Sequence, residues 1–445
     1  MASDVGIPAH PEDCRCRHES LLGWLGEMRS DVLEQLWRTA DRTRSQFVGR
    51  RVGVWGTIKL SNHCDEDCGF CGLRSGTSAI TRYRLSAHDV LAAAQRAAAA
   101  GCTAVVLQAG RDGELVASWV SELIHRIGES TGLEVVLSLG ERSEEELSAW
   151  KHAGAGAYLL RFMTANTTLY RMLHASACED PRHRLPMLAR LRQLGYRVGS
   201  GVLVGFPGQS IASVADDLEL IRTLDLDIVL ASPYVWPAEL SRGRGAVKDS
   251  DPNSPLAVMK AMALARHLCP GADIPTTAAL ATVGGHATHE QALGCGANAV
   301  VVDFTPAPQL AQYRCYPGRT CIDESAWANG AAGLRALVEQ RRQGTDAVSA
   351  AGGPDAATAP PARQEVLIGV CMGSSCFSRG NNRTVAAVRD FITHEHLEGR
   401  AMVEGHLCEG MCKEGPNVMI GGEMMQHAEP TAVIASILHR LKLKE

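Results

Sequence analysis

Short apolar runs alternate with amphipathic segments over most of the chain, and no other feature of the sequence constrains the fold as strongly. Eight of these runs have the length and β-branched content of buried strands. They span Val52–Leu60, Ala104–Gln108, Glu134–Leu139, Ala157–Phe162, Val198–Gly205, Ile228–Ser232, Asp273–Thr277 and Asn298–Asp303. The helical stretches between them include Ser86–Ala100, Ser143–His152, Arg184–Leu194, Ser210–Thr223 and Pro255–Leu268. Strands joined through helices pair in parallel, so the sequence predicts an α/β fold with a closed (βα)8 barrel of the TIM type, whose ligands gather where the strands end. A doubly wound open sheet is the alternative.

A segment of linker composition separates this barrel from a smaller C-terminal unit. Residues 343–364 are dominated by Ala, Gly, Pro, Ser and Thr and hold no bulky apolar anchor, so they cannot bury enough surface to offset the entropy of ordering. We therefore expect four parts: an N-terminal tail and helical cap at 1–50, the barrel at 51–342, the flexible linker, and a second α/β domain at 365–445.

Composition and charge argue against several classes of partner. The 445 residues are 45% hydrophobic and 21% charged, as in globular proteins, and no apolar run approaches the roughly 18 residues of a membrane span. With 44 Lys and Arg against 49 Asp and Glu and no basic block, neither nucleic acid nor an anionic membrane has electrostatic support. The first residues lack the pattern of a secretory signal. We expect a cytoplasmic protein, in which the 15 cysteines are metal ligands or buried thiols before disulfides.

Three cysteines directly after the first expected strand give the clearest chemical signal. Cys64, Cys68 and Cys71 have C-x3-C-x2-C spacing on one loop, which suits thiolates around one metal cluster. Three ligands on a four-iron cluster leave one iron free for a small molecule, whereas a structural zinc site, the alternative, usually takes four protein ligands. This motif, with Phe70 before the last cysteine, resembles that of the radical S-adenosylmethionine (SAM) superfamily. The resemblance implies a 4Fe–4S cluster and SAM as cofactors, and reductive cleavage of SAM to a 5′-deoxyadenosyl radical.

A longer resemblance covers about residues 30–325. The stretches CGFCGLR, AVVLQAG, VVLSLGE, AYLLRFMTAN, LGYRVGSGVLVGFPGQ, IPTTAALAT, CGANAVVVDFTPAP and CYPGRTC, in this order, resemble the HydE family of FeFe-hydrogenase maturases, in the wider group of biotin synthase and methylornithine synthase. The resemblance implies action on a small cysteine-derived or iron-carbonyl substrate during assembly of the hydrogenase H-cluster. It also implies electron donors or other maturation proteins as partners.

The same resemblance suggests individual site residues. Phe70 resembles the aromatic residue beside the adenosyl group, Gln108 and Gly110 end a strand near the methionine amine, and Arg184 resembles the arginine that binds the methionine carboxylate. Arg161 resembles the arginine of an anion site in the cavity, and we expect it to take part in catalysis by anchoring a substrate carboxylate. The expected members of this anion site are Arg161, Thr276, Thr277 and Tyr313.

The sequence also departs from the family. The usual Arg-His-Glu-Thr segment is here Arg161-Phe-Met-Thr164, which removes two hydrogen-bonding groups near the expected cofactor and substrate. This departure keeps an alternative open, a diverged relative that rearranges a free amino acid as methylornithine synthase does. Only Cys321 matches the family's accessory-cluster ligands, so we expect that cluster to be absent. The expected strands 134–139, 157–162 and 198–205 contain no cysteine, which argues against sulfur donation of the biotin-synthase type.

The C-terminal unit carries a second set of cysteines. A C-x4-C pair and a C-x3-C pair each follow an expected strand, and the whole unit resembles the thioredoxin-like 2Fe–2S ferredoxins. Four thiolates on two loops suit a 2Fe–2S cluster, with a zinc site as the alternative. The expected ligands are Cys371, Cys376, Cys408 and Cys412. Such a unit could feed electrons to the barrel, sense redox state, dock another maturase or form a dimer. A non-enzymatic alternative for the chain is an iron–sulfur carrier or scaffold.

Two further features give weaker signals. His286 and His289 have the spacing of metal ligands, but they begin a helix in a polar segment, and we expect them to be solvated. Cys315 follows no pairing pattern and is expected to be a buried thiol.

Overall fold

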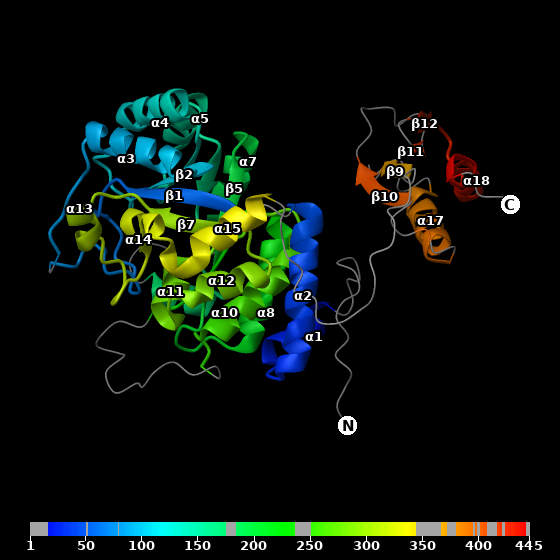
Figure 1. Cartoon of the computed structure of the whole chain (residues 1–445), viewed down its shortest axis with the longest axis horizontal. Helices are drawn as coiled ribbons and strands as arrows, with labels where there is room; N and C mark the ends of the chain where they lie inside the picture. Colours follow the sequence, from blue (N-terminus) through cyan, green and yellow to red (C-terminus); the bar gives the residue numbers. More distant parts are fainter. Residues whose placement is uncertain are drawn as a thin grey trace. The chain divides into compact units, whose positions relative to one another are not determined.

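The computed structural model describes residues 17–49, 52–78, 80–174, 184–235, 251–343, 366–371, 380–394, 397, 401–406, 416–420 and 423–441. By its internal contacts the chain divides into two units, residues 1–348 and residues 349–445 (Figure 1). Among the helices of this described part, none is long and apolar enough to cross a membrane.

The first unit is built around a parallel sheet that follows most of the expected strands. Its strands are β1 (Gly53–Lys59), β2 (Ala104–Gln108), β3 (Glu134–Ser138), β4 (Ala157–Leu159), β5 (Arg197–Val204), β6 (Ile228–Pro233), β7 (Ala299–Asp303) and β8 (Ile322–Asp323). Every neighbouring pair is parallel, in the order β6-β5-β4-β3-β2-β1-β7-β8. Because β1 to β6 are neighbours in sequence order, each connection between them crosses over through at least one helix.

The segment that connects β6 to β7 in the sequence lies between these two strands and closes the ring. Asp273 forms an isolated bridge to Ile228 of β6, and Pro275 forms one to Ala299 of β7. Since proline has no N–H to donate, the expected strand Asp273–Thr277 makes separate bridges instead of a ladder. The predicted (βα)8 barrel is confirmed, and a doubly wound sheet, whose strand order reverses at a switch point, does not fit this order.

Helices cover the outside of the barrel, and a serine precedes four of them. α3 (Ala87–Ala99), α5 (Glu144–His152), α8 (Ile211–Leu224) and α10 (Pro255–Leu268) each begin after a serine whose hydroxyl accepts a backbone N–H of the first turn. The other helices of the barrel unit are α4 (Ala117–Thr131), α6 (Thr167–Leu173), α7 (Arg184–Gln193), α11 (Ala278–Gly284), α12 (Ala287–Gly294), α13 (Ala307–Gln312), α14 (Glu324–Ala328) and α15 (Leu334–Gln343). Two N-terminal helices, α1 (Arg17–Gly26) and α2 (Ser30–Phe47), pack against α10.

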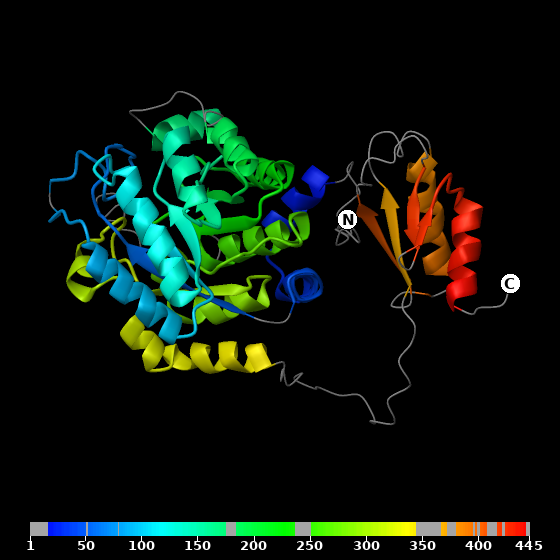
Figure 2. The ribbon, with the colours of Figure 1, turned by 90° about the horizontal axis from the view of Figure 1, so that it is seen from above.

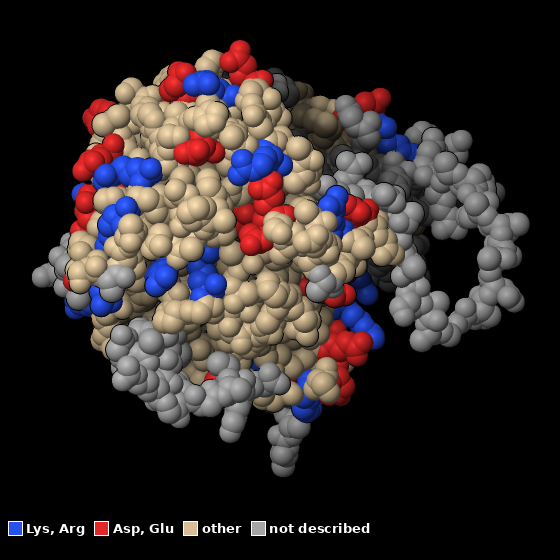
Figure 3. All heavy atoms as spheres, turned by 60° about the vertical axis from the view of Figure 1, so that its left-hand side comes forward, with Lys and Arg blue, Asp and Glu red and all other residues tan. Residues whose placement is uncertain are grey.

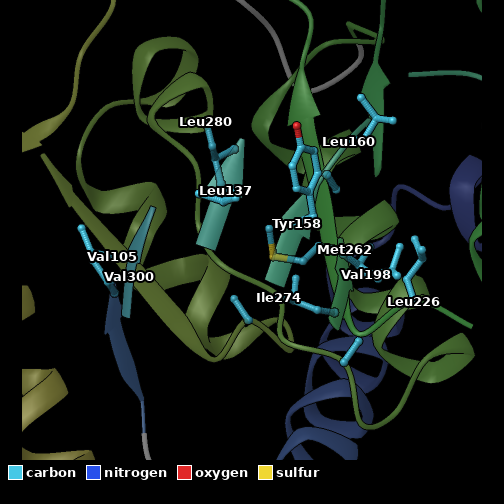
Figure 4. Close-up of a cluster of buried hydrophobic side chains, with 14 of the residues drawn as sticks. Val105, Leu137, Tyr158, Leu160, Val198, Leu226, Met262, Ile274, Leu280 and Val300 are labelled. Carbon is cyan, nitrogen blue, oxygen red and sulfur yellow. The ribbon is translucent and has the colours of Figure 1, made fainter. Parts of the chain in front are cut away.

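Strand side chains alternate between an outer core and the interior of the barrel. Val105, Leu137 and Val198 belong to the outer core, where they share one apolar cluster with helix residues such as Met262 (Figure 4). A separate cluster fills the interior with Trp55, Ala104, Val106, Val136, Ala157, Leu159, Ile228, Leu230 and Ala299. None of these inner side chains lies beyond the middle of its strand except Leu159, which ends the short strand β4, so open space is left toward the carboxyl ends.

The second unit is a four-stranded mixed sheet with two helices. Its elements are β9 (Val366–Cys371), α17 (Asn382–His394), β10 (Ala401–His406), β11 (Val418–Ile420), β12 (Glu423–Met425) and α18 (Pro430–Leu441). The strand order is β10-β9-β11-β12, in which β10 and β9 are parallel and the other pairs are antiparallel. The helices pack against each other beside the sheet (Figure 2). The β11–β12 hairpin was not expected from the sequence, because its strands are too short for a clear period-two pattern.

Of the four expected 2Fe–2S ligands, one backbone is described. Cys371 is the last residue of β9, where a ligand loop is expected to start. Cys376, Cys408 and Cys412 lie outside the described residues.

Candidate active site

A cavity of about 370 Å³ opens at the carboxyl ends of the barrel strands. Trp55, Val106, Leu159 and Leu230 of the inner cluster form its apolar floor. All the barrel-site residues expected from the sequence line this one cavity: Cys64, Cys68, Phe70, Cys71, Gln108, Gly110, Arg161, Arg184, Thr276, Thr277 and Tyr313. The strand ends therefore bring together side chains that are up to 249 positions apart, from Cys64 to Tyr313, at the usual place of a barrel's active site.

Backbone contacts hold the cysteine loop against the rest of the barrel. The N–H of Cys71 donates to the carbonyl of Cys68 over 3.0 Å, and the N–H of Gly72 donates to the carbonyl of Cys315 over 2.8 Å. A Cβ on Gly72 would lie 2.2 Å from the carbonyl oxygen of Arg314, so this close approach requires glycine.

Gly110, just after β2, allows a second close approach to the same loop. A Cβ at this position would lie 2.6 Å from the Cβ of Cys64 and 2.8 Å from its Sγ. Within the described residues, no three His, Cys, Asp or Glu side chains are arranged to hold a single metal ion. Thiolates around one zinc would lie about 3.8 Å apart, from Zn–S bonds of about 2.3 Å. Cys64, Cys68 and Cys71 lie on one loop and all line the cavity, and three thiolates from one loop are the donor set that would hold a 4Fe–4S cluster there.

The cysteine thiols are partly buried in the cavity wall and form no disulfide. Burial raises the pKa of the Cys68 thiol to about 11, although the positive charge of Arg184 opposes this shift. Burial also raises the pKa of the Cys71 thiol. Because iron binds thiolates, loading this loop must release protons to solvent.

Arg184, the first residue of α7, connects two parts of the expected site. Its Nε donates to Glu141 Oε1 over 2.8 Å, and its Nη1 donates to the backbone carbonyl of Arg161 over 2.6 Å. Phe70 packs edge-on against His174, with ring centroids 5.4 Å apart. Arg184 is thus already paired with the carboxylate of Glu141, and it contacts the main chain of Arg161, the residue expected to hold the substrate.

A buried charge cluster that we did not expect from the sequence lies beside Gln108. Lys59 donates through Nζ to Gln108 Oε1, and it lies 3.8 Å from Asp303 Oδ2. Arg319 donates to the same oxygen of Asp303 over 2.7 Å. Two cations thus share one carboxylate. A single lysine at the end of an apolar strand was the signal in the sequence, because an unpaired ammonium would not be buried there.

The pKa values in this cluster are set by burial and by the three charges together. Burial lowers the pKa of Lys59, and Asp303 opposes the shift. Burial would raise the pKa of Asp303, but Lys59 and Arg319 outweigh it and hold that pKa below its usual value. The carboxyl group is therefore ionised at neutral pH.

Arg161 lies just after β4, where the regular backbone pairing with β5 stops. The hydroxyl of Ser200, on β5, donates to the carbonyl of Leu160 over 2.7 Å and accepts from the N–H of Phe162 over 3.1 Å. These side-chain bonds replace the backbone ladder on both sides of Arg161. As a result, β4 ends at Leu159 and does not reach Phe162, the end expected from the sequence.

Met163 continues this irregular segment with a left-handed backbone, φ 69°, which is uncommon for a residue with a side chain. Its N–H donates to the carbonyl of Gly201, and its carbonyl accepts from the N–H of Leu203, both over 3.1 Å. The Met163 side chain lines the cavity near Phe70, whereas Phe162 is fully buried in the outer core. Of the two departures from the family segment, only Met163 therefore changes the cavity.

The guanidinium of Arg161 makes no hydrogen bond or ion pair with any other described residue. Burial lowers its pKa, and Tyr316 and Cys315 oppose the shift. Thr276 and Thr277 are buried and line the same cavity. Arg161 thus brings a positive charge into the cavity without a protein partner in the described part of the chain.

The two tyrosines at the end of the cavity lie in different surroundings. The ring of Tyr313 lies over Lys59 at 5.2 Å and over Arg319 at 5.7 Å. Tyr316, which we did not expect, also lines the cavity, and it opposes the lowering of the Arg161 pKa by burial. The sequence signal was present in the aromatic residue of the CYPGRTC stretch.

Two cysteines outside the motif also face the cavity. Cys315 and Cys321 line it, and both are partly exposed, whereas Cys315 was expected to be a buried thiol. Arg319 Nη1 lies 3.4 Å from the Sγ of Cys321.

The outer surface lacks a broad patch of one charge on the face that Figure 3 shows. Lys and Arg side chains are interspersed there with Asp and Glu side chains. The uncompensated positive charges of Arg161 and of the Lys59–Asp303–Arg319 cluster, in contrast, lie in the cavity, which supports a small anionic ligand there.

Two family models match the chain. The model of the radical SAM superfamily matches residues 58–221, and that of the thioredoxin-like 2Fe–2S ferredoxins matches residues 358–442. The predictions of an enzyme with a 4Fe–4S cluster and SAM, and of a 2Fe–2S cluster in the C-terminal unit, are confirmed by these families.

Characterised relatives match the barrel over most of their length. The FeFe hydrogenase maturase subunit HydE of Thermotoga maritima is 35% identical over 302 residues, which cover 65% of this chain and 81% of the relative. The 3-methylornithine synthase of Methanosarcina barkeri is 29% identical over 280 residues, which cover 62% of this chain and 77% of the relative.

Solved structures share the fold. A crystal structure of methylornithine synthase superposes with a TM-score of 0.62 at 24% identity, and it covers 74% of this chain and 98% of its own. A structure of HydG, a maturase of the FeFe hydrogenase, superposes with a TM-score of 0.54 at 19% identity, with 64% of each chain covered.

Proposed function

Because the chain belongs to the radical SAM superfamily and, within it, to the family of the FeFe hydrogenase maturase subunit HydE, we propose that it acts on a small cysteine-derived or iron-carbonyl substrate during assembly of the hydrogenase H-cluster. When bound, the 4Fe–4S cluster and SAM supply a 5′-deoxyadenosyl radical. Cys64, Cys68 and Cys71 would hold the cluster, and Gly110 leaves the space that their loop needs. The residues proposed to contact SAM are Phe70, Gln108, Gly110 and Arg184.

The observation that carries the proposal is the guanidinium of Arg161, which lines the cavity without a carboxylate partner among the described residues. Lys59 and Arg319 share the single carboxylate of Asp303, so this cluster adds a second uncompensated positive charge. Uncompensated cations in a buried site are costly, and a bound anion offsets that cost. The cavity therefore favours an anionic substrate, with its carboxylate on Arg161.

The chemistry of the cavity also separates this proposal from the amino-acid rearrangement. A free amino acid carries an ammonium group, which needs an acceptor in a buried site. The carboxylates that line the cavity are each paired with arginine or lysine: Glu66 with Arg111, Glu141 with Arg184, and Asp303 with Lys59 and Arg319. Met163 stands where the family has a hydrogen-bonding group. An anionic substrate with an apolar body fits these walls better than a substrate with a free ammonium group.

The test is anaerobic reconstitution with iron and sulfide, followed by dithionite and SAM, with 5′-deoxyadenosine as the product measured. We expect product from the full chain and none from the Cys64→Ala/Cys68→Ala/Cys71→Ala variant. A cysteine-bearing iron-carbonyl complex is expected to stimulate the rate, and Arg161→Gln is expected to lose the stimulation but to keep the basal rate. Stimulation by free lysine or ornithine alone would favour the rearrangement. An absence of product with both clusters loaded would favour an iron–sulfur carrier.

For the C-terminal unit we propose electron delivery to the barrel. A 2Fe–2S cluster transfers one electron at a time, which is what reductive cleavage of SAM requires. A Cys408→Ser/Cys412→Ser variant of the full chain should turn over slowly with a flavodoxin or ferredoxin as reductant and normally with dithionite. An equal loss with both reductants would contradict electron delivery.

A further inference from the structure

His289 is buried, whereas the polar segment around it led us to expect a solvated side chain. Only 1% of its surface is exposed, because α12 packs its inner face against α11 and α2. His286, at the start of the same helix, is exposed. The two histidines therefore have different surroundings, although they are only three positions apart.

The ring of His289 contacts the wall of the cavity from behind. Its Nδ1 lies 2.8 Å from the hydroxyl oxygen of Thr276, which is fully buried and lines the cavity. Its Nε2 is also buried and has no hydrogen-bond partner in the described part of the chain. His289 is not itself among the residues that line the cavity, so any effect on a ligand passes through Thr276.

The direction of this hydrogen bond depends on where the ring carries its proton. Burial, with a smaller effect of His286, lowers the pKa of His289 to about 4, so the ring is neutral at pH 7 and has one N–H. If the proton is on Nε2, Nδ1 must accept from Thr276, and the threonine presents only lone pairs to the cavity. If the proton is on Nδ1, the ring donates to Thr276 and the hydroxyl hydrogen is free to point into the cavity.

We propose that His289 is a positioning residue whose Nδ1–H donates to Thr276 and so directs the threonine hydroxyl hydrogen toward an anion in the cavity. The inference rests on the proposed function, in which the cavity binds a substrate carboxylate. Only this tautomer allows both hydrogen bonds at once, one from the ring to Thr276 and a charge-assisted one from Thr276 to the anion. The other tautomer turns an acceptor toward the anion and repels it.

The hydroxyl of Thr277 is also able to donate to the cavity, but through a different contact. Its hydroxyl oxygen accepts the backbone N–H of Leu280, over 3.3 Å, at the start of α11. Its hydroxyl hydrogen donates to no other residue in the described part of the chain, so it too can point into the cavity. Two adjacent threonines thus become donors to the cavity, one through the backbone of a helix and the other through the imidazole of His289.

The tautomer can be observed directly. The full chain, with its clusters oxidised, would be labelled with 15N in the histidine rings, and the signals of His289 would be assigned by their loss in His289→Leu. We expect the pattern of an Nδ1–H tautomer, and we expect Thr276→Val to move the Nδ1 signal whereas Thr277→Val leaves it in place. An Nε2–H pattern in the wild type, or a ring spectrum that Thr276→Val does not change, would overturn the proposal.

Binding of N-acetyl-L-cysteine, a carboxylate probe without an ammonium group, tests the consequence. We expect His289→Leu to weaken it about 10- to 100-fold, as for the loss of one charge-assisted hydrogen bond. His289→Asn, whose amide N–H can replace Nδ1–H, should recover most of the affinity, and His286→Leu should have no effect. In a Thr276→Val background, His289→Leu should cost nothing further, and a full additional loss would overturn the proposal. Failure of the wild type to bind N-acetyl-L-cysteine would count against the carboxylate substrate, while the ring spectrum alone decides the tautomer.

Discussion

The guanidinium of Arg184 donates a hydrogen bond of 2.6 Å to the backbone carbonyl of Arg161. The first residue is proposed to bind the methionine carboxylate of SAM, and the second to bind the substrate carboxylate. The hydroxyl of Ser200 also holds this stretch of main chain, because it bonds to the backbone of Leu160 and Phe162, the two neighbours of Arg161. The two proposed ligand sites are therefore joined through one short stretch of main chain, and loss of the Arg184 side chain is expected to affect both ligands.

Arg184→Gln tests this connection. The variant loses the positive charge of the guanidinium and its hydrogen bond to the Arg161 carbonyl. We therefore expect the half-saturating concentration of SAM to rise roughly 10- to 100-fold. Because the Arg161 main chain loses a partner, the half-saturating concentration of the substrate should rise too, by a smaller factor. Both are measured from 5′-deoxyadenosine formation. Arg190→Gln is the matched control, since Arg190 lies on the same helix but pairs with the exposed Glu144. An effect on SAM alone would contradict the connection.

Ser200→Ala should lower stability and weaken binding to Arg161. Ser200 is fully buried, and its hydroxyl makes two hydrogen bonds that the alanine cannot replace, so the carbonyl of Leu160 and the N–H of Phe162 are left unpaired. We expect a loss of about 1–3 kcal/mol in the free energy of unfolding. Ser232→Ala, at the end of the neighbouring strand β6, is the control, because the buried hydroxyl of Ser232 has no partner in the described part of the chain. Equal thermal unfolding temperatures for the two variants would show that the Ser200 bonds contribute nothing.

The regular parts of the barrel could be predicted from the sequence because they depend on local pattern. Apolar runs and helix-starting serines such as Ser143 and Ser254 are read within a few residues. The early end of β4 could not be predicted in this way. It depends on Ser200, which lies 40 positions from Leu160 in the sequence and replaces two backbone bonds with its side chain.

The site was also predicted only in part, because some of its residues belong to local sequence patterns and others do not. Residues that belong to recognisable stretches, such as Arg161 and Thr276, were expected and line the cavity. The Lys59–Asp303–Arg319 cluster was missed because its members come from two strand ends and a loop, and only the closed barrel brings both cations within 4 Å of Asp303. Long-range pairing of buried charges has no local sequence pattern.

Gly110→Ala should prevent assembly of the barrel cluster. The new Cβ would lie 2.6 Å from the Cβ of Cys64 and from the carbonyl oxygen of His63, so the cysteine loop must move. We expect anaerobic reconstitution to yield about four fewer irons per chain, with the 2Fe–2S signal retained. Iron analysis and electron paramagnetic resonance of the reduced protein measure the two clusters. Gly113→Ala is the control, because its nearest contact would be at an ordinary 3.5 Å. Full iron content in Gly110→Ala would mean that the loop tolerates the displacement.

Asp217 is expected to give the barrel a pH-dependent stability. This residue of α8 anchors the segment after Arg161, since its Oδ1 accepts from the hydroxyl of Thr164 over 2.9 Å and its Oδ2 accepts from Gln209 over 3.1 Å. Burial raises the pKa of Asp217 to about 7, and these donors only partly oppose the shift. The folded state thus holds a proton that the unfolded chain releases near pH 4. A raised carboxyl pKa stabilises the fold at low pH, and this contribution is lost as pH rises toward 7.

The measurement is the free energy of unfolding of the reconstituted chain between pH 5 and pH 8. From Asp217 alone we expect a fall of at most about 1.4 kcal/mol per pH unit up to about pH 7 and no further change above it. Asp217→Asn carries no titratable proton, so its stability relative to the wild type should rise over the same interval and then level off. Asp216→Asn, at the exposed neighbouring position, should keep most of the wild-type slope. Parallel curves for the wild type and Asp217→Asn would mean that Asp217 is ionised in the folded barrel across this range, with its hydrogen-bond donors outweighing its burial.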